Sequence, residues 1–178
     1  MQLPSALALL ASALGFTTAL NLPDGAWEGT TLANGRHLVK AAGAADSEAF
    51  VYEPTGSTAT QKRGGAAVAK RTVGCFGYQL DTSGVDRSAE ALRKWAGSGG
   101  HTLTSGKGNN WYAVVVEETI VYYCIDAPNS SGNLDVNDVN YALGQMDATC
   151  RPYEASYFNW PGSVEIVGKG RKGDNICV

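Results

Sequence analysis

Residues 111–125 read WYAVVVEETIVYYCI, and this stretch decides the fold of the chain. Two runs of aromatic and β-branched residues, 111–116 and 119–125, flank Glu117 and Glu118. Runs of this kind on either side of a short polar break predict an antiparallel β-hairpin. Because two glutamates lack the glycine or asparagine that tight hairpin turns favour, we expect a slightly longer loop between the strands.

One amphipathic helix is predicted on each side of this hairpin. Before it, the apolar residues of 85–96 recur at helical spacing, and Ser83 and Asp86 have the spacing of a capping box. After it, the apolar residues of 136–150 follow spacings of three and four, and Asp135 stands at the start of the run. Each helix therefore has one apolar face for the core.

Short strands are predicted at residues 73–80, 155–160 and 164–167. The order strand, helix, hairpin, helix, strand is the split β-α-β pattern of a ferredoxin-like plait. We therefore expect an α+β sandwich in which two helices cover one face of an antiparallel sheet and disulfides tie the elements together. The expected core consists of Val85, Leu92, Val114, Val116, Ile120, Tyr122, Val136, Val139, Leu143 and Met146.

The start of the chain has the composition of a secretory signal. Residues 5–18 are uncharged and mostly Ala and Leu, and Thr17, Thr18 and Ala19 offer small residues at the positions that a signal peptidase reads. A run of roughly 14 apolar residues is too short to span a bilayer. We therefore expect a signal peptide over residues 1–19, cleaved after Ala19, and no membrane span.

A pro-segment is predicted after the signal. Residues 20–71 are rich in Ala, Gly and Thr, lack cysteine and contain few large apolar side chains, which is typical of a largely unfolded segment. The segment contains two dibasic pairs, Lys62 with Arg63 and Lys70 with Arg71, of the kind that kexin-type proteases cut in the secretory pathway. We predict cleavage after Arg71; the alternative is that such pairs occur by chance in a polar loop.

The predicted mature domain, residues 72–178, contains every cysteine of the chain: Cys75, Cys124, Cys150 and Cys177. An even number of cysteines in an exported chain predicts two disulfides, and four cysteines allow three pairings. In the predicted plait the first and third strands are antiparallel neighbours, which favours Cys75 with Cys124 and leaves Cys150 for Cys177. Asn129 begins an N-glycosylation sequon in a polar loop.

Charge and spacing narrow the function classes. Residues 72–178 carry eight Lys or Arg and twelve Asp or Glu, a balance that argues against binding to nucleic acid or anionic membranes. The cysteines lack the close spacing of a zinc site. Asn133, Asp135 and Asn137 alternate like calcium ligands, but Gly144 stands where such a loop needs glutamate, so helix capping explains them better. We expect a monomer without metal or cofactor.

Basic and aromatic residues are the candidate recognition groups. Residues 168–173, GKGRKG, match the letters of a dinucleotide fingerprint but do not open a helix in a βαβ unit. They form a basic cluster that is either a solvated turn or a contact for an anionic partner. Aromatic side chains either emerge on the open sheet face or lie under a glycan or the C-terminal arm. The candidates are Trp111, Tyr157, Trp160, Lys169, Arg171 and Lys172. Trp160 is preferred because it adjoins Pro161 and Gly162 at a strand end, where we expect a large ring to be partly exposed.

In layout the chain resembles the small cysteine-containing secreted proteins of filamentous fungi, many of which are treated as candidate effectors. The resemblance rests on the predicted signal peptide with its dibasic pro-segment and on five short motifs: GCFGY at 74–78, VYYC at 121–124, DVND at 135–138, YEA at 153–155 and IC at 176–177. The order of strands and helices is also similar to that of virally encoded fungal killer toxins and of the necrosis-inducing-factor effector domain. The resemblance implies a non-catalytic exported protein that acts on a host or a competitor.

We therefore expect a secreted, extracellular protein of effector or toxin type, which recognises an unknown protein or cell-surface ligand without catalysis. One alternative is a secreted hydrolase or ribonuclease-like enzyme that uses His101, although a lone histidine supplies no acid-base pair without a carboxylate partner. The other alternative is a structural cell-wall protein, for which repeats or Ser/Thr-rich tracts are typical.

Overall fold

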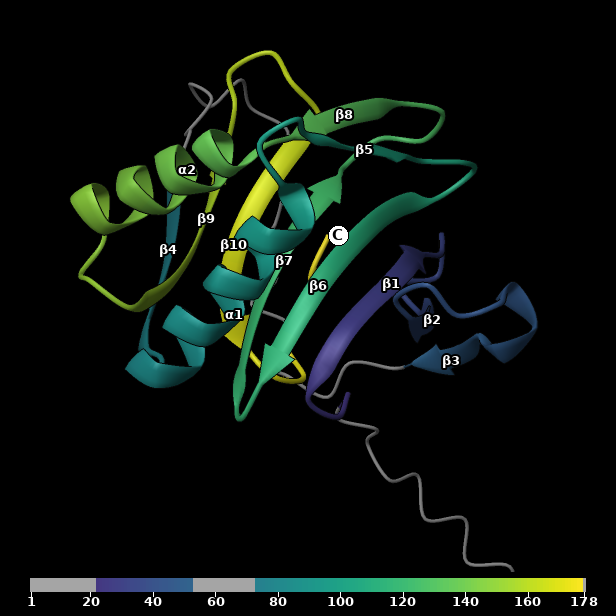
Figure 1. Cartoon of the computed structure of the whole chain (residues 1–178), viewed down its shortest axis with the longest axis horizontal. Coiled ribbons are helices and arrows are strands. Elements are labelled where there is room, and N and C mark those ends of the chain that lie inside the picture. Colours follow the sequence, from purple (N-terminus) through teal and green to yellow (C-terminus); the bar gives the residue numbers. More distant parts are fainter. Residues whose placement is uncertain (1–21, 53–72, 178) are drawn as a thin grey trace, which may run out of the picture.

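The computed structural model describes residues 22–52 and 73–177, in which two helices lie on one face of a long antiparallel sheet (Figure 1). The elements are β1 (Gly25–Thr31), β2 (His37–Ala41), the 3₁₀ turn η1 (Asp46–Glu48), β3 (Phe50–Tyr52), β4 (Val73–Gln79), α1 (Thr82–Ala96), β5 (His101–Thr104), β6 (Asn109–Val116), β7 (Thr119–Ile125), β8 (Ser131–Leu134), α2 (Val136–Thr149), β9 (Glu154–Asn159) and β10 (Glu165–Arg171). The expected α+β class with an antiparallel sheet and two helices is confirmed. In the part of the chain that is described, no helix has the length and apolar character needed to cross a bilayer.

The strand order differs from that of the predicted ferredoxin-like plait, which is therefore not confirmed. The sheet runs β3-β2-β1-β6-β7-β10-β9-β4, and β5 pairs with β8 in a separate small sheet. In the plait, residues 73–80 would lie beside residues 119–125. Instead β4 is an edge strand paired with β9, and β10 is inserted between β9 and β7.

The central hairpin forms as predicted, but its turn is tighter than expected. Val116 pairs with Thr119, so the turn has only two residues, and Glu117 adopts a left-handed φ of 55°. That conformation is unfavourable for a residue with a side chain. Here the backbone N–H of Glu117 donates to Oδ2 of Asp24 at 3.0 Å, and its side chain pairs with Arg87 at 2.9 Å. Contacts from two other segments therefore hold the turn.

Both helices begin at an aspartate. The side chain of Asp81 accepts a hydrogen bond from the backbone N–H of Gly84, in place of the cap predicted at Ser83. The side chain of Asp135 accepts hydrogen bonds from two backbone N–H groups. In return, Oδ2 of Asp138 accepts a hydrogen bond from the backbone N–H of Asp135 at 3.2 Å. This reciprocal pair is a capping box, which satisfies donors at the start of α2. The predicted capping role of Asp135 is confirmed.

Since side chains alternate along a strand, the central hairpin supplies two separate cores rather than the single one expected. The helix-side core includes Leu92, Val114, Val121, Tyr123, Val139, Leu143 and Met146. The core on the opposite face includes Trp111, Ala113, Val115, Ile120 and Tyr122, packed with Leu22, Val39, Tyr52, Ile176 and the Cys124–Cys177 disulfide. Among the expected core residues, Val116 and Val136 are only half-buried, and Val85 packs with Leu80 and Ala155 in a small third cluster.

The predicted disulfide pairing is wrong, although two disulfides form. Cys75 bonds to Cys150, and Cys124 bonds to Cys177, with Cα atoms 5.7 and 5.8 Å apart. The prediction assumed that the strands of Cys75 and Cys124 are neighbours, whereas two other strands separate them. One disulfide therefore ties the edge strand β4 to the end of α2, and the other ties the C-terminal arm to β7. Two disulfides are consistent with an extracellular protein.

Residues 22–52 are not the largely unfolded segment that their composition predicted. β1 pairs with β6 over seven registered positions, from Gly25 opposite Val115 to Thr31 opposite Asn109. β2 and β3 continue the sheet from there. These strands are short, and they are held by pairing with their neighbours and by burial of side chains such as Val39 and Tyr52. The predicted signal and processing residues lie outside the described residues: Ala19, Lys62, Arg63, Lys70 and Arg71.

Candidate functional site

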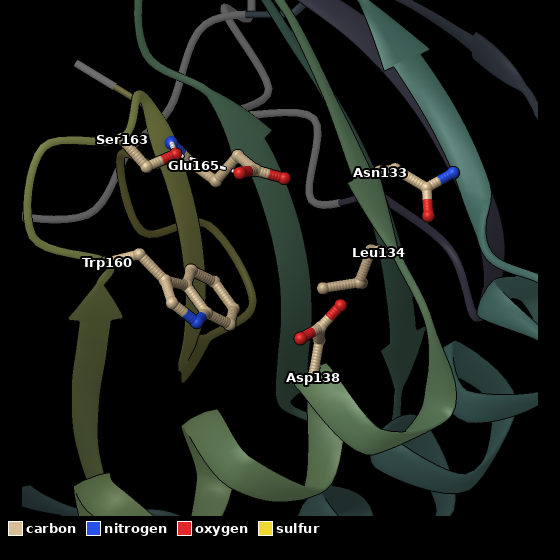
Figure 2. Close-up of a pocket in the computed structure, with 6 residues that line it drawn as sticks. All are labelled: Asn133, Leu134, Asp138, Trp160, Ser163 and Glu165. Atoms are coloured by element: carbon tan, nitrogen blue, oxygen red, sulfur yellow. Dashed lines mark hydrogen bonds between the residues drawn. The ribbon is translucent and has the colours of Figure 1, made fainter.

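A pocket of about 280 Å³ lies where β8 meets the start of α2 and where β9 turns into β10 (Figure 2). The turn between β9 and β10 passes through Pro161 and Gly162, and Gly162 has a φ of 81°, which suits glycine. The lining residues are Asn133, Leu134, Asp138, Trp160, Ser163 and Glu165. They come from two segments, 133–138 and 160–165, which the sheet and the second helix bring together.

Trp160 forms one wall of the pocket, and its indole ring points into the space between the lining residues (Figure 2). The residue directly follows β9 and is half-buried. Its ring meets the ring of Phe158 edge-on, with centroids 4.8 Å apart, and Phe158 is buried in the helix-side core. The backbone N–H of Ser163 donates to the carbonyl of Trp160 at 3.0 Å. The core and the turn together hold the ring in place.

The carboxylate of Glu165 has a fixed orientation. The hydroxyl of Tyr123 donates to its Oε1 at 2.6 Å, and the hydroxyl of Ser163 donates to its Oε2 at 2.8 Å. The pKa of Tyr123 is raised well above its usual range, mainly by burial and secondly by the hydrogen bond to this carboxylate, so the phenol remains a donor. A carboxylate oxygen accepts more than one hydrogen bond, so Glu165 retains acceptor capacity for a ligand.

Asp138 brings a second carboxylate to the pocket from the first turn of α2. Its Oδ2 accepts the capping bond from the backbone of Asp135, which sets the direction of the side chain. Of the six described residues that line the pocket, two are carboxylates and none is basic. An aromatic ring beside two carboxylates has the chemistry to attract a cationic group, through the face of the ring and through charge-assisted hydrogen bonds.

The other candidate contact residues do not gather at this pocket. Trp111 is 1% exposed and its indole N–H donates to His37, and Lys169 is 1% exposed and pairs with Asp147 of α2. Burial of these two side chains leaves them no free contact surface in this structure. Tyr157 is half-buried, with its ring centroid 5.8 Å from that of Phe76.

The basic residues of 168–173 do not share one surface, because Lys169 is buried whereas Arg171 and Lys172 are not. Lys169 and the glycines beside it belong to β10 rather than to the turn that was expected. Arg171 is exposed, with its guanidinium 4.4 Å from the ring centroid of Tyr78, and Lys172 is partly exposed. Two of the three basic side chains therefore reach solvent, at the far end of β10 from Glu165.

His101 and Asn129 both lie on the surface. The ring of His101 stacks on Trp95 with centroids 4.2 Å apart, and Trp95 stacks in turn on Tyr112 at 4.0 Å. Among the described residues, no carboxylate is hydrogen-bonded to His101. Asn129 is exposed in the turn before β8, with a φ of 51°. Glycosylation of Asn129 stays a prediction.

Sequence reasoning named Trp160 as a candidate contact residue but did not single out the two acidic residues that line the same pocket. Asp138 lies at the start of the helix predicted over residues 136–150, and Glu165 lies within the predicted strand 164–167; neither belongs to a binding motif. No spacing rule links the two, because the pocket exists only after β9 and β10 pair beside α2. In the described part of the chain, no group of three or more His, Cys, Asp or Glu residues could hold a metal ion.

Comparison with known proteins found no relative of the chain. No family model matches it, and no curated protein or solved structure is similar enough to count as a match. Function is therefore argued from the residues and their geometry.

Proposed function

We propose that the chain is a secreted recognition protein of fungal effector or toxin type, which binds a host or competitor target and catalyses no reaction. The observation that carries this proposal is the pocket in which Trp160 faces Asp138 and Glu165. The two disulfides and the apolar leader support export. Aromatic side chains that become buried at the centre of an interface commonly supply most of its binding energy. Trp160 is only half-buried in the free protein, so a partner could still cover its ring.

The pocket favours a cationic group of the target, such as a lysine or arginine side chain of a protein. Trp is the best of the aromatic residues at attracting a cation over its ring face. Glu165 is already oriented by Tyr123 and Ser163, so little ordering is needed when a donor arrives. The lining contains two carboxylates and no basic residue, so a cation that enters the pocket meets charges of the opposite sign.

A binding titration tests the chemistry of the pocket. The probe is Nα-acetyl-lysine methylamide, and the readout is the NMR signal of the Trp160 indole N–H, assigned with the variant Trp160→Phe. We expect this signal to shift with the lysine probe and not with the norleucine analogue, which has similar length and no charge. Equal shifts with both probes would refute recognition of a cation.

Two variants keep the local hydrogen bonds while they remove charge. Asp138→Asn still offers an oxygen to the backbone of Asp135, and Glu165→Gln still accepts from Tyr123. Each is expected to weaken binding of the lysine probe several-fold, in line with about 1 kcal/mol for a partly exposed charge pair. Glu90→Gln, which removes an exposed charge from α1, is the matched control and should leave binding unchanged.

A further inference from the structure

The two parts of the chain on either side of the dibasic pairs build one sheet. We call residues 22–52 the N-terminal segment and residues 73–177 the C-terminal segment. β1 of the first pairs along its whole length with β6 of the second. The disulfides link Cys75 with Cys150 and Cys124 with Cys177, so both lie within the C-terminal segment. Apart from the polypeptide backbone, the segments are therefore joined by non-covalent contacts alone.

These contacts include a tightly packed apolar core. Leu22, Val39 and Tyr52 of the N-terminal segment are buried in the same cluster as Trp111 and Val115 of the C-terminal segment. The fit is closest at Gly29, which lies opposite Trp111 in the register. A Cβ atom at Gly29 would lie 2.2 Å from the nearest indole atom, which no side chain tolerates without a shift. The N-terminal segment thus fits the surface on which it lies.

Buried polar contacts also cross the interface. The indole N–H of Trp111 donates to Nδ1 of His37 at 3.2 Å. Because Nδ1 is the acceptor, the proton of the neutral ring is on Nε2, which donates to Oδ1 of Asn175 at 3.0 Å. His37 is 1% exposed. Without the N-terminal segment, a buried indole N–H would lose its partner and β6 would become an open strand edge beside an apolar face.

We infer that cleavage at the dibasic pairs does not release the N-terminal segment, and that the processed protein is a complex of two chains held by the β1–β6 pairing. Each cut hydrolyses one peptide bond: water adds to the carbonyl carbon of Arg63 or Arg71, leaving a carboxylate there and an amine on Gly64 or Thr72. This inference rests on the proposed export past a kexin-type protease. The domain over residues 72–178 is then only one part of the folded unit.

The experiment uses a precursor of residues 20–178, cut with a purified kexin-type protease. Under denaturing conditions, mass spectrometry should show two chains that end and begin at the dibasic pairs. By native mass spectrometry and size-exclusion chromatography at micromolar concentration, both chains should remain in one particle. Elution of the N-terminal chain on its own would overturn the inference, and so would a precursor that the protease leaves intact.

Matched variants test whether the packing holds the complex together. Gly29→Val places side-chain atoms against the Trp111 ring and should raise the dissociation constant of the cut complex at least about tenfold. Leu38→Ala changes an exposed side chain of the same segment and should leave it unchanged. If the Gly29→Val precursor fails to fold, His37→Gln should weaken the cut complex in the same direction, and an unchanged constant there overturns the inference.

The readout separates this inference from the proposed function. Assembly of the two chains is measured without any target, so loss of binding at Trp160 does not affect it. Conversely, release of the N-terminal chain would leave the titration of the Trp160 pocket unaltered as a test of recognition.

Discussion

The indole of Trp111 donates a hydrogen bond to the imidazole of His37, and 74 positions of sequence separate the two residues. Burial lowers the pKa of His37 below its usual 6.5, and the bond to Asn175 opposes this only in part. Protonation would turn Nδ1 into a donor facing the donor of Trp111. The neutral ring is therefore the form that the fold requires.

We predict that acid weakens the fold through His37. With a folded-state pKa below 6.5, the stability that the neutral ring supports is complete above about pH 6.5 and decreases as the pH falls toward the folded-state value. The neighbouring Tyr52 has its pKa raised to about 12 by burial, so it does not titrate in this range. Urea denaturation between pH 7.5 and 5 measures the effect.

The variant His37→Gln is the control for this pH dependence. It should be less stable than the wild type at pH 7.5 by about 1 to 3 kcal/mol, the cost of a disrupted buried polar contact. Its stability should vary less with pH between 7.5 and 5. Parallel curves for the two proteins would show that other groups cause the acid response.

Two glycines are predicted to respond to alanine in opposite directions. Gly29→Ala places a methyl group against the Trp111 ring and should destabilise the protein by about 1 to 3 kcal/mol. Gly144→Ala lies on an exposed helix position with open space around it and should stabilise by about 0.5 to 1 kcal/mol. Thermal unfolding of both variants tests the prediction, and a stable Gly29→Ala protein would contradict the packing described for β1.

The two disulfides should differ in their response to a mild reductant. Cys75 is exposed and Cys150 is half-buried, whereas Cys124 and Cys177 are buried. We expect the Cys75–Cys150 bond to be reduced first, because thiol exchange needs access to the sulfur. Alkylation of partly reduced protein, followed by peptide mapping, gives the order. Recovery of a peptide with Cys75 linked to Cys124 would instead restore the pairing expected from the plait.

Activity should depend on Trp160 and not on His101. If Trp160 contributes as a binding anchor commonly does, its change to alanine costs at least about 2 kcal/mol of binding free energy, or roughly thirtyfold in affinity. His101→Ala removes only a ring stacked on Trp95. Host-response or growth-inhibition assays with folded, secreted variants measure both. Loss of activity with the histidine change alone would favour the enzyme alternative.

The helices and the central hairpin could be predicted because their signals are local. The apolar spacing of residues 136–150 and the β-branched runs around Glu117 and Glu118 are visible in a short window of sequence. The turn between those runs was mispredicted because its support comes from Asp24 and Arg87, which are distant in sequence.

The strand order could not be predicted because β10 decides it. Residues 164–167 were predicted as a strand, but residues 168–171, GKGR, have the composition of a basic turn and nevertheless continue the inserted strand. Gly168 has a reason that only the sheet reveals: a Cβ atom there would lie 2.2 Å from the ring of Tyr122 on the neighbouring strand. The pocket depends on the same pairing, so Asp138 and Glu165 could not be linked before the strand order was known.

The two free edges of the large sheet have a consequence for how the protein behaves at high concentration. At one end the described part of β3 spans Phe50–Tyr52, and at the other the pairing of β4 shifts register between Cys75 and Gln79, where Cys75 is also bonded to Cys150. Short or irregular edges give an incoming strand few consecutive partners. Among the described residues, neither edge of the large sheet offers a long regular run of partners, which disfavours edge-to-edge stacking of copies into fibrils.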